Sequence, residues 1–205
     1  MKRPASAGWP AALAACALAA YWLPGLSAVL IYDRSAILAG ELWRLITGHW
    51  VHFSASHLLC DVVVLGVSGW LIEARGYRFF PALCGVAALS ISLAMLAALP
   101  DLAQYGGLSG VAMASTVYLA LHGRREASPW RWICVGILAL GIGKLSYDVI
   151  GGGFSLMELG DETVFNVPMS HFVGAAAGLA MYLWSVMNCD AAGTGNERGA
   201  ASCEV

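Results

Sequence analysis

Charged residues are scarce in this chain. Only 12% of its 205 residues are Asp, Glu, Lys or Arg, whereas 59% are hydrophobic. A soluble domain carries about 25% charged residues. Because so little polar surface cannot cover a water-facing globule, the composition places the chain in a lipid bilayer.

Three other patterns are missing, and the first two absences argue against particular kinds of site or partner. The six cysteines form no CxxC pair, and most of them lie inside apolar runs, which argues against a zinc site or a disulfide framework. There is no basic stripe with interleaved aromatic residues, so no nucleic-acid partner is expected. We also find no internal repeat.

Six apolar runs, separated by polar or charged connections, account for most of the chain. They predict an all-α, polytopic membrane protein, a six-helix bundle with a short central fourth helix. A single membrane domain is expected over residues 1–187, followed by a small, polar, disordered cytoplasmic tail over 188–205. The expected spans are 9–32, 54–72, 80–99, 109–121, 132–150 and 168–187.

The first apolar run has two competing interpretations. It could be a cleaved signal peptide, or a lipoprotein signal in which Leu13-Ala14-Ala15-Cys16 is the lipobox. The stretch before Cys16 is short and interrupted by proline, and the apolar run continues beyond it. These features favour an uncleaved first span.

Basic residues in the connections predict the orientation of the spans. Six spans leave both ends of the chain on one side, and most of the Lys and Arg residues fall on that side, which should therefore be the cytoplasm. We expect a bacterial inner-membrane protein with Ser109 near the outer face. The residues on the side of the two ends are Lys2, Arg3, Arg75, Arg78, Arg124, Arg125, Arg131 and Arg198, against Arg34 and Arg44 on the other.

A serine lies among glycines where the fourth helix should begin, in the run Gly106-Gly107-Leu108-Ser109-Gly110. Glycines allow a tight turn and a close approach of the backbone. The start of a helix offers unpaired N–H groups and the positive end of the helix dipole. Ser109 is therefore a candidate nucleophile whose oxyanion would meet ready donors. The alternative is a turn with a capping serine.

Ionisable side chains at membrane depth are costly and mark sites or partners. His57 and Asp61 are four residues apart on one face of the second span, and His52 lies just above them, near the surface. A polar pair between helices is the structural alternative. Lys144 and Asp148 have the same spacing in the fifth span, and we interpret them as a structural intrahelical ion pair.

The sixth span carries a histidine beside a close-packing motif. His171 lies one turn before Gly174, and Gly178 follows at the small-xxx-small spacing that lets another helix approach closely. The helix that begins at Ser109 is the expected partner, because it offers Gly110 and several small residues. This packing would bring Ser109 and His171 together as nucleophile and base.

Several short motifs, each weak alone, occur in a specific order over residues 41–184. They are Trp43-Arg44, the run from His52 to Asp61, Gly69 to Glu73, Gly107-Leu108-Ser109-Gly110 and His171-xx-Gly174-xxx-Gly178. In this order and on these spans, the chain resembles the rhomboid intramembrane serine proteases.

The resemblance implies a role for each matching residue. Ser109 would be the nucleophile, and His171 the general base and then the acid for the leaving amine, as a dyad with no third carboxylate. His57 and the backbone N–H of Ser109 would bind the oxyanion. The supporting positions would be Gly107, Gly110 and His52.

Two positions depart from the family pattern. Asp61 lies where most members carry an asparagine that donates to the oxyanion, whereas an ionised aspartate only accepts and would repel it. Asp61 would serve if burial kept it protonated, or if it oriented His57 and stabilised its charged form. Met113 lies where relatives often carry a tyrosine that stacks on the base, so other contacts must position His171.

The resemblance implies an endopeptidase that cleaves transmembrane segments of single-span or tail-anchored proteins near the outer face, without metal or cofactor. The connection over 151–167 would cap the site. The run from Trp43 to His52 and the compact chain resemble the rhombosortase branch, for which C-terminal sorting tails of exported proteins are the expected substrates.

Two other functions compete with proteolysis. An inactive rhomboid-like protein that binds or escorts membrane clients usually lacks the serine or the histidine, and this chain has both. A small transporter would use His57, Asp61, Lys144 and Asp148 as a proton path, but it predicts an internal repeat.

Overall fold

The structure is a computed structural model that describes residues 8–150 and 167–193. Within this part of the chain nearly all regular structure is helical, because long apolar runs in a membrane must satisfy their backbone groups internally. Four of the described helices are long and apolar enough to cross a bilayer. They are α5 (Ala55–Ala74), α6 (Phe80–Ala98), α8 (Trp130–Ile150) and α9 (Pro168–Gly193).

Helix α1 (Gly8–Trp22) is shorter than the first expected span, so a single helix over 9–32 is wrong. Pro24 cannot donate a backbone hydrogen bond, and Gly25 adopts a left-handed conformation with φ of 78°. The chain turns there and forms the short helix α2 (Leu26–Leu30). A helix of 15 residues is about 22 Å long, less than the roughly 30 Å of a hydrocarbon core.

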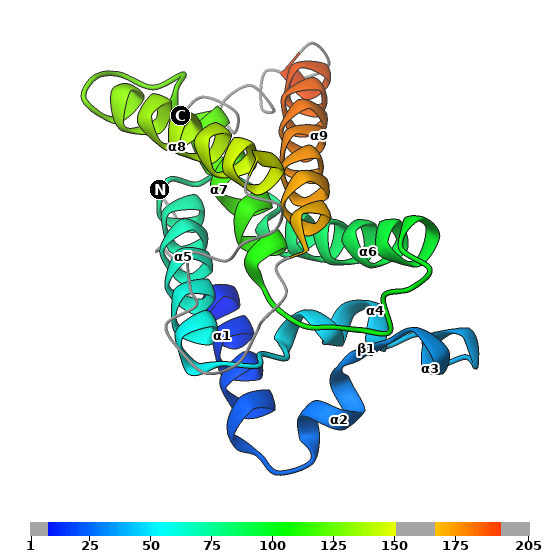
Figure 1. Ribbon diagram of the computed structural model, residues 1–205. Helices are drawn as coiled ribbons and strands as arrows, with labels where there is room; N and C mark the ends of the chain where they lie inside the picture. Colours follow the sequence, from blue (N-terminus) through cyan, green and yellow to red (C-terminus); the bar gives the residue numbers. More distant parts are fainter. Residues whose placement is uncertain (1–7, 151–166, 194–205) are drawn as a thin grey trace.

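A connection of short elements follows α2 and lies below the long helices in Figure 1. Its strand β1 pairs with β2, which lies between α6 and α7, in a two-stranded antiparallel sheet that the sequence did not predict, with Tyr32 opposite Tyr105. Arg44 organises the connection, since its guanidinium donates to the carbonyl oxygens of Ala28 and Ile31 at 3.0 and 2.8 Å. The elements of the connection are β1 (Tyr32–Asp33), α3 (Arg34–Leu38), α4 (Arg44–Thr47) and the 3₁₀ turn η1 (Gly48–Trp50). Strand β2 is Gln104–Tyr105.

Helix α7 (Ser109–Gly123) is the centre of the bundle. It packs against α5, α6, α8 and α9 (Figure 1). Its Val111, Ala114 and Tyr118 are buried in a core that also includes Leu65 of α5 and Ile91 of α6. With 15 residues it is short, and it begins at the serine of the glycine-rich run.

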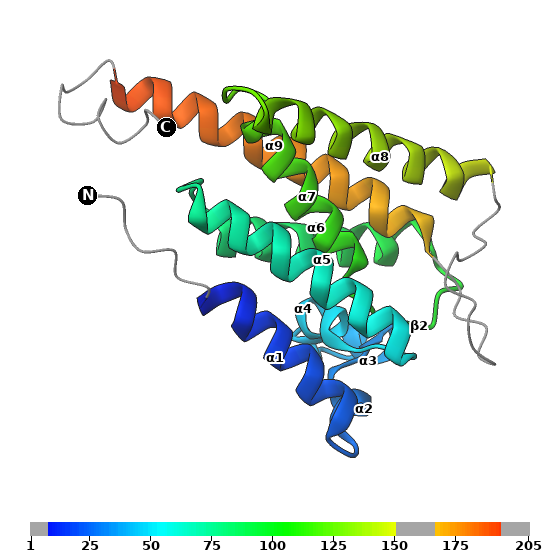
Figure 2. The same ribbon diagram turned by 90° about the vertical axis from the view of Figure 1, so that its left-hand side faces the viewer.

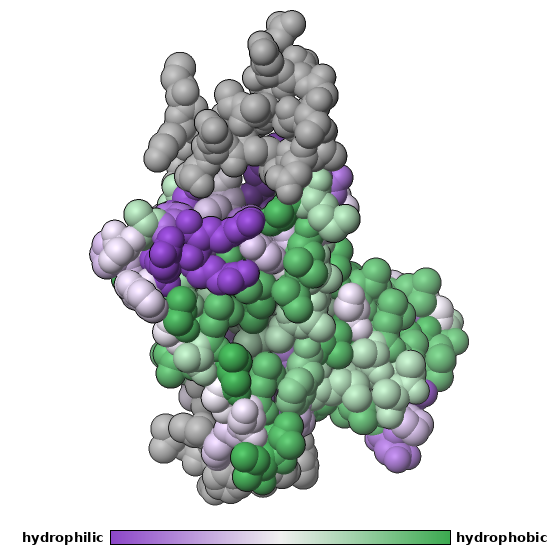
Figure 3. Space-filling model, turned by 90° about the horizontal axis from the view of Figure 1, so that it is seen from above, coloured by the Kyte–Doolittle hydropathy of each residue, from purple (hydrophilic) through white to green (hydrophobic). Residues whose placement is uncertain are grey.

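The outer surface of the helices is apolar. In α8, Leu140 and Ile142 expose 76% and 64% of their area, and the residues that this helix buries are Cys134 and Asp148. Figure 3 shows a mostly hydrophobic face with one large hydrophilic patch at the left and a smaller one at the lower right. Together with the four long helices, this surface makes the chain a multi-pass integral membrane protein.

Two expectations fall partly or wholly on residues that the structure does not describe. The capping connection expected over 151–167 lies almost entirely outside the described residues, as does the part of the expected tail from 194 to 205. Helix α9 continues to Gly193 instead of ending at 187.

Candidate active site

The backbone before α7 passes very close to the second span. Gly107 has a φ of 135°, and a Cβ atom there would lie 2.9 Å from Cε1 of His57. A side chain at this position would be strained and would collide with the imidazole. Glycine is therefore required where the backbone passes His57 on its way to Ser109, which is half-buried and is the first residue of α7.

Helices α7 and α9 cross at their glycines. A Cβ atom on Gly174 would lie 2.1 Å from the carbonyl oxygen of Gly110, and one on Gly178 would lie 2.5 Å from that of Ala114. Both contacts advance in the same direction along the two helices, so α7 and α9 run parallel. Ser109 and His171 consequently lie at the same end of this crossing.

Asp61 is held between two histidines. Its Oδ2 atom lies 3.1 Å from Nε2 of His52 and 3.2 Å from Nε2 of His57. The side chain of His52 is fully buried within the protein. The chain turns inward after η1, and Nδ1 of His52 lies 3.1 Å from the carbonyl oxygen of Trp50.

Hydrogen-bond chemistry restricts what this cluster can do. A carbonyl only accepts, so Nδ1 of His52 must carry a proton to bond to Trp50, and an ionised Asp61 would likewise require a proton on Nε2. Nδ1 of His57 is buried and has no hydrogen-bond partner within residues 8–150 and 167–193. Because Nε2 of His57 faces Asp61, Nδ1 is the ring atom left to meet a ligand. In this geometry Asp61 contacts both His52 and His57 and can orient either ring.

His171 also has a carboxylate partner. Its Nδ1 atom lies 2.7 Å from Oδ2 of Asp148, while Oδ1 of Asp148 accepts from Lys144. The intrahelical ion pair expected from the sequence is present, but the contact with His171 was not expected. The sequence signal that could have found this contact is depth in the membrane. Asp148 lies near the end of the fifth expected span and His171 near the start of the sixth, so both fall on one side of the bilayer.

Two further residues that the sequence analysis did not assign hold the backbone before Ser109. The ring nitrogens of His49 lie 2.9 Å from the carbonyl oxygen of Ala88 and 3.3 Å from that of Gly107. Burial lowers the pKa of His49 to about 4, so the ring is neutral at pH 7. The hydroxyl of Tyr105 donates to the same Gly107 carbonyl. The only sequence signal for His49 is that it precedes His52 and His57 as a further histidine in the run that leads into the second span.

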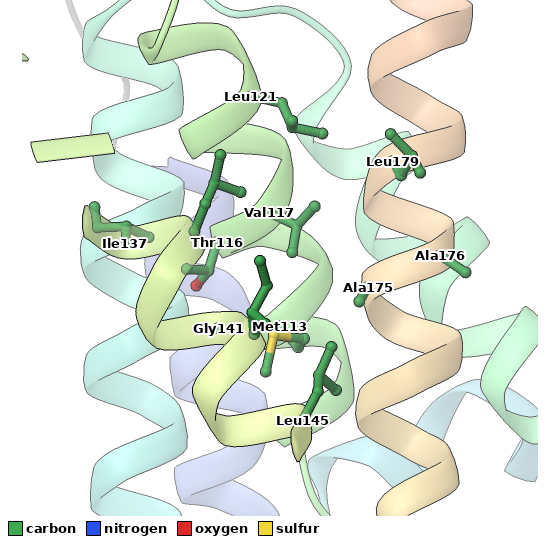
Figure 4. A pocket seen from close by; sticks show the side chains of 12 residues that line it. Met113, Thr116, Val117, Leu121, Ile137, Gly141, Leu145, Ala175, Ala176 and Leu179 are labelled. Atoms are coloured by element: carbon green, nitrogen blue, oxygen red, sulfur yellow. The ribbon is translucent and has the colours of Figure 1, made fainter. Parts of the chain in front are cut away.

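An apolar pocket of about 280 Å³ lies between α7, α8 and α9 (Figure 4). Met113 lies at the position where a tyrosine that stacks on the base was expected from the family pattern. It lines this pocket together with Val117 and Leu145. The lining is almost wholly hydrocarbon, so the pocket can accept an apolar side chain or part of an acyl chain.

Cys16, Cys60, Cys84 and Cys134 are free thiols. None of them contributes to the cluster around Ser109.

Comparison with known protein families identifies the family of this chain. The chain matches the rhomboid domain over residues 39–188, a range that includes the polar residues from His49 to His171. Because this range covers most of the chain, the protein belongs to the rhomboid family, whose members are generally intramembrane serine proteases.

Proposed function

We propose that this protein is an intramembrane serine endopeptidase in which Ser109 is the nucleophile and His171 the general base. The observation that supports it best is the parallel crossing of α7 and α9, where a Cβ atom on Gly174 would lie only 2.1 Å from the carbonyl oxygen of Gly110. This crossing keeps a serine at a helix start and a histidine at the same end of the bundle.

The reaction begins when a substrate helix enters the bundle and unwinds, since peptide groups in a helix are protected from attack. Nε2 of His171 takes the proton of Ser109 as its oxygen attacks the carbonyl. The oxyanion meets the Ser109 N–H, an orphan donor at a helix start, and the free nitrogen of His57. His171 then protonates the leaving amine, and water hydrolyses the acyl-enzyme.

We further propose six crossings, with α1 and α7 completing the four long helices, in a bacterial inner membrane. Two features support cytoplasmic ends. The start of α1 and the end of α9 lie on the same side of the bundle (Figure 2). Arg124, Arg125 and Arg131 are exposed in the connection between α7 and α8 and next to it. The active site then opens toward the exterior.

The proposed substrates are membrane-anchored proteins with one span or a tail anchor, including C-terminal sorting tails if the protein is a rhombosortase. The motif from Trp43 to His52 supports that branch. In the structure Arg44 of this motif is buried and pairs with Glu41, so the run shapes the outer connection.

A serine-reactive fluorophosphonate tests the proposal. The wild-type protein in detergent should be labelled covalently, whereas Ser109→Ala should not be labelled and His171→Ala should react far more slowly, because the base is missing. Equal labelling of all three proteins would contradict the proposal and favour a non-catalytic protein that binds membrane clients.

Asp61 gives a separate prediction. An ionised Asp61 only accepts, so it takes a hydrogen bond from Nε2 of His57, and Nδ1 then carries a proton for the oxyanion only when the ring is charged. An asparagine amide at this position can donate to Nε2, which leaves the proton of a neutral ring on Nδ1. Asp61→Asn should therefore stay within about threefold of wild type, whereas Asp61→Leu should lose about 10²-fold in kcat, the range for a lost oxyanion donor.

Steady-state cleavage of a reporter with one transmembrane helix, in proteoliposomes, measures this difference. If Asp61→Leu were as active as Asp61→Asn, the contact with His57 would have no part in catalysis. A large loss in Asp61→Asn would show instead that the negative charge is needed.

A further inference from the structure

We propose that Asp148 is a positioning residue for His171, so that the base works as part of a Ser109–His171–Asp148 arrangement and not as half of a dyad. The inference rests on the proposed function, since it concerns the same serine and histidine. It adds a residue from α8, a helix whose other buried residue is Cys134.

The first argument is the hydrogen bond between the two side chains. Nδ1 of His171 lies 2.7 Å from Oδ2 of Asp148, and the side chains expose only 7% and 0% of their area. An ionised carboxylate can only accept, so the ring proton lies on Nδ1. Nε2 of His171 then carries a lone pair, which is the form of the ring that can take a proton from a serine hydroxyl.

The second argument is the placement of Asp148. Helix α8 is mostly exposed to lipid, and the residues it buries are Cys134 and Asp148. An ion pair between Lys144 and Asp148 alone would not require this burial, because a lysine at a span end can extend its ammonium toward the headgroups. Burying a carboxylate is costly unless partners compensate it. Contact with His171 accounts for the inward position of Asp148.

The third argument is the position of Lys144. Its ammonium binds the oxygen of Asp148 that His171 does not use. One carboxylate therefore bridges a lysine on its own helix and the histidine on α9. The lysine balances the charge of Asp148, so the carboxylate can hold the imidazole without taking its proton.

The fourth argument is the residue at 113. Where a tyrosine ring would stack on the base, this chain has Met113, which lines the apolar pocket between α7, α8 and α9. Among the described residues, none of the aromatic ring contacts involves His171. Asp148 supplies the contact that fixes the orientation of the ring.

The test compares four proteins: wild type, Asp148→Asn, Asp148→Glu and the matched control Asp101→Asn, which changes an exposed aspartate. An asparagine amide can donate to Nδ1 and so favours the wrong tautomer, with the proton on Nε2. Asp148→Asn should lower kcat and the fluorophosphonate labelling rate by about 10²-fold. KM and the unfolding temperature should not change, Asp148→Glu should recover part of the rate, and Asp101→Asn should match wild type.

The outcomes separate this inference from the function on which it rests. If wild type is not labelled at Ser109, the proposed function fails and this inference fails with it. If wild type is labelled and Asp148→Asn reacts within threefold of it, only the role of Asp148 is overturned. If Asp148→Asn lost rate together with thermal stability, or if its KM rose as much as its kcat fell, the positioning role would also be overturned. A merely structural role of Asp148 would explain either result.

Nitrogen NMR of the wild-type protein, labelled with ¹⁵N-histidine, provides a test that needs no Asp148 variant. The signals of His171 are identified by their absence in His171→Ala. At a pH where the ring is neutral, its proton should be on Nδ1. A proton on Nε2 would overturn the inference.

Discussion

Replacing Ser109 by alanine should abolish cleavage, and replacing His171 by alanine should have nearly the same effect. The two residues act in one proton transfer, so the loss of either removes the whole step. Each variant should lose at least about 10⁴-fold in kcat, and the double variant should lose no more than either single variant. Any remaining acceleration relative to the uncatalysed reaction in water would come from substrate binding and from the oxyanion donors.

Single-turnover cleavage of a reporter with one transmembrane helix, in proteoliposomes, measures this effect without interference from product release. Ser146→Ala is the matched control, because Ser146 is exposed on α8. Cleavage that persists in Ser109→Ala would place the nucleophile elsewhere. If the losses in the double variant multiplied, Ser109 and His171 would act independently and the dyad would be wrong.

Replacing Gly174 by alanine should force α9 away from α7 and remove most of the activity. The new Cβ atom would lie 2.1 Å from the carbonyl oxygen of Gly110, and a backbone oxygen in a helix cannot move aside as a flexible side chain can. Overpacking of this kind costs about 3 kcal/mol or more. Gly178→Ala should behave similarly, since its nearest atom is the carbonyl oxygen of Ala114 at 2.5 Å.

The control for Gly174 is Gly85→Ala in α6, where a Cβ atom would meet nothing within 4 Å. Alanine has the better helix propensity, by about 1 kcal/mol, so Gly85→Ala should be neutral or slightly stabilising. Thermal unfolding in detergent and the fluorophosphonate labelling rate are the measurements. If Gly174→Ala kept both values at the wild-type level, the close crossing of α7 and α9 would be contradicted.

Motifs within single helices could be read directly from the sequence. The apolar runs predicted α5 to α8 with ends close to those observed, because length and hydropathy determine which segments can enter a bilayer. The order of the short motifs pointed to the rhomboid family, and the match over residues 39–188 confirms it. The pairs His57–Asp61 and Lys144–Asp148 also followed from their spacing, since residues four apart share one face of a helix.

The first span shows where this local reasoning failed. Hydropathy alone merged residues 9–32 into one helix, although Pro24 and Gly25 end α1 at Trp22. An apolar composition does not show whether a segment continues as a helix or turns. The local backbone preferences of proline and glycine are the stronger signal at such a point.

Contacts between distant segments could not be read from spacing at all. His171 and Asp148 are 23 residues apart, and His49 and Gly107 are 58 apart, so their meeting depends on how the helices cross. The crossing in turn depends on the shape of whole helix faces, such as the glycines that let α9 approach α7. Spacing therefore identified Ser109, His171, His57 and Asp61 as candidates, because chemistry and helical periodicity are local. The tertiary structure added Asp148 and His49, because segments far apart in the sequence meet only after the bundle has formed.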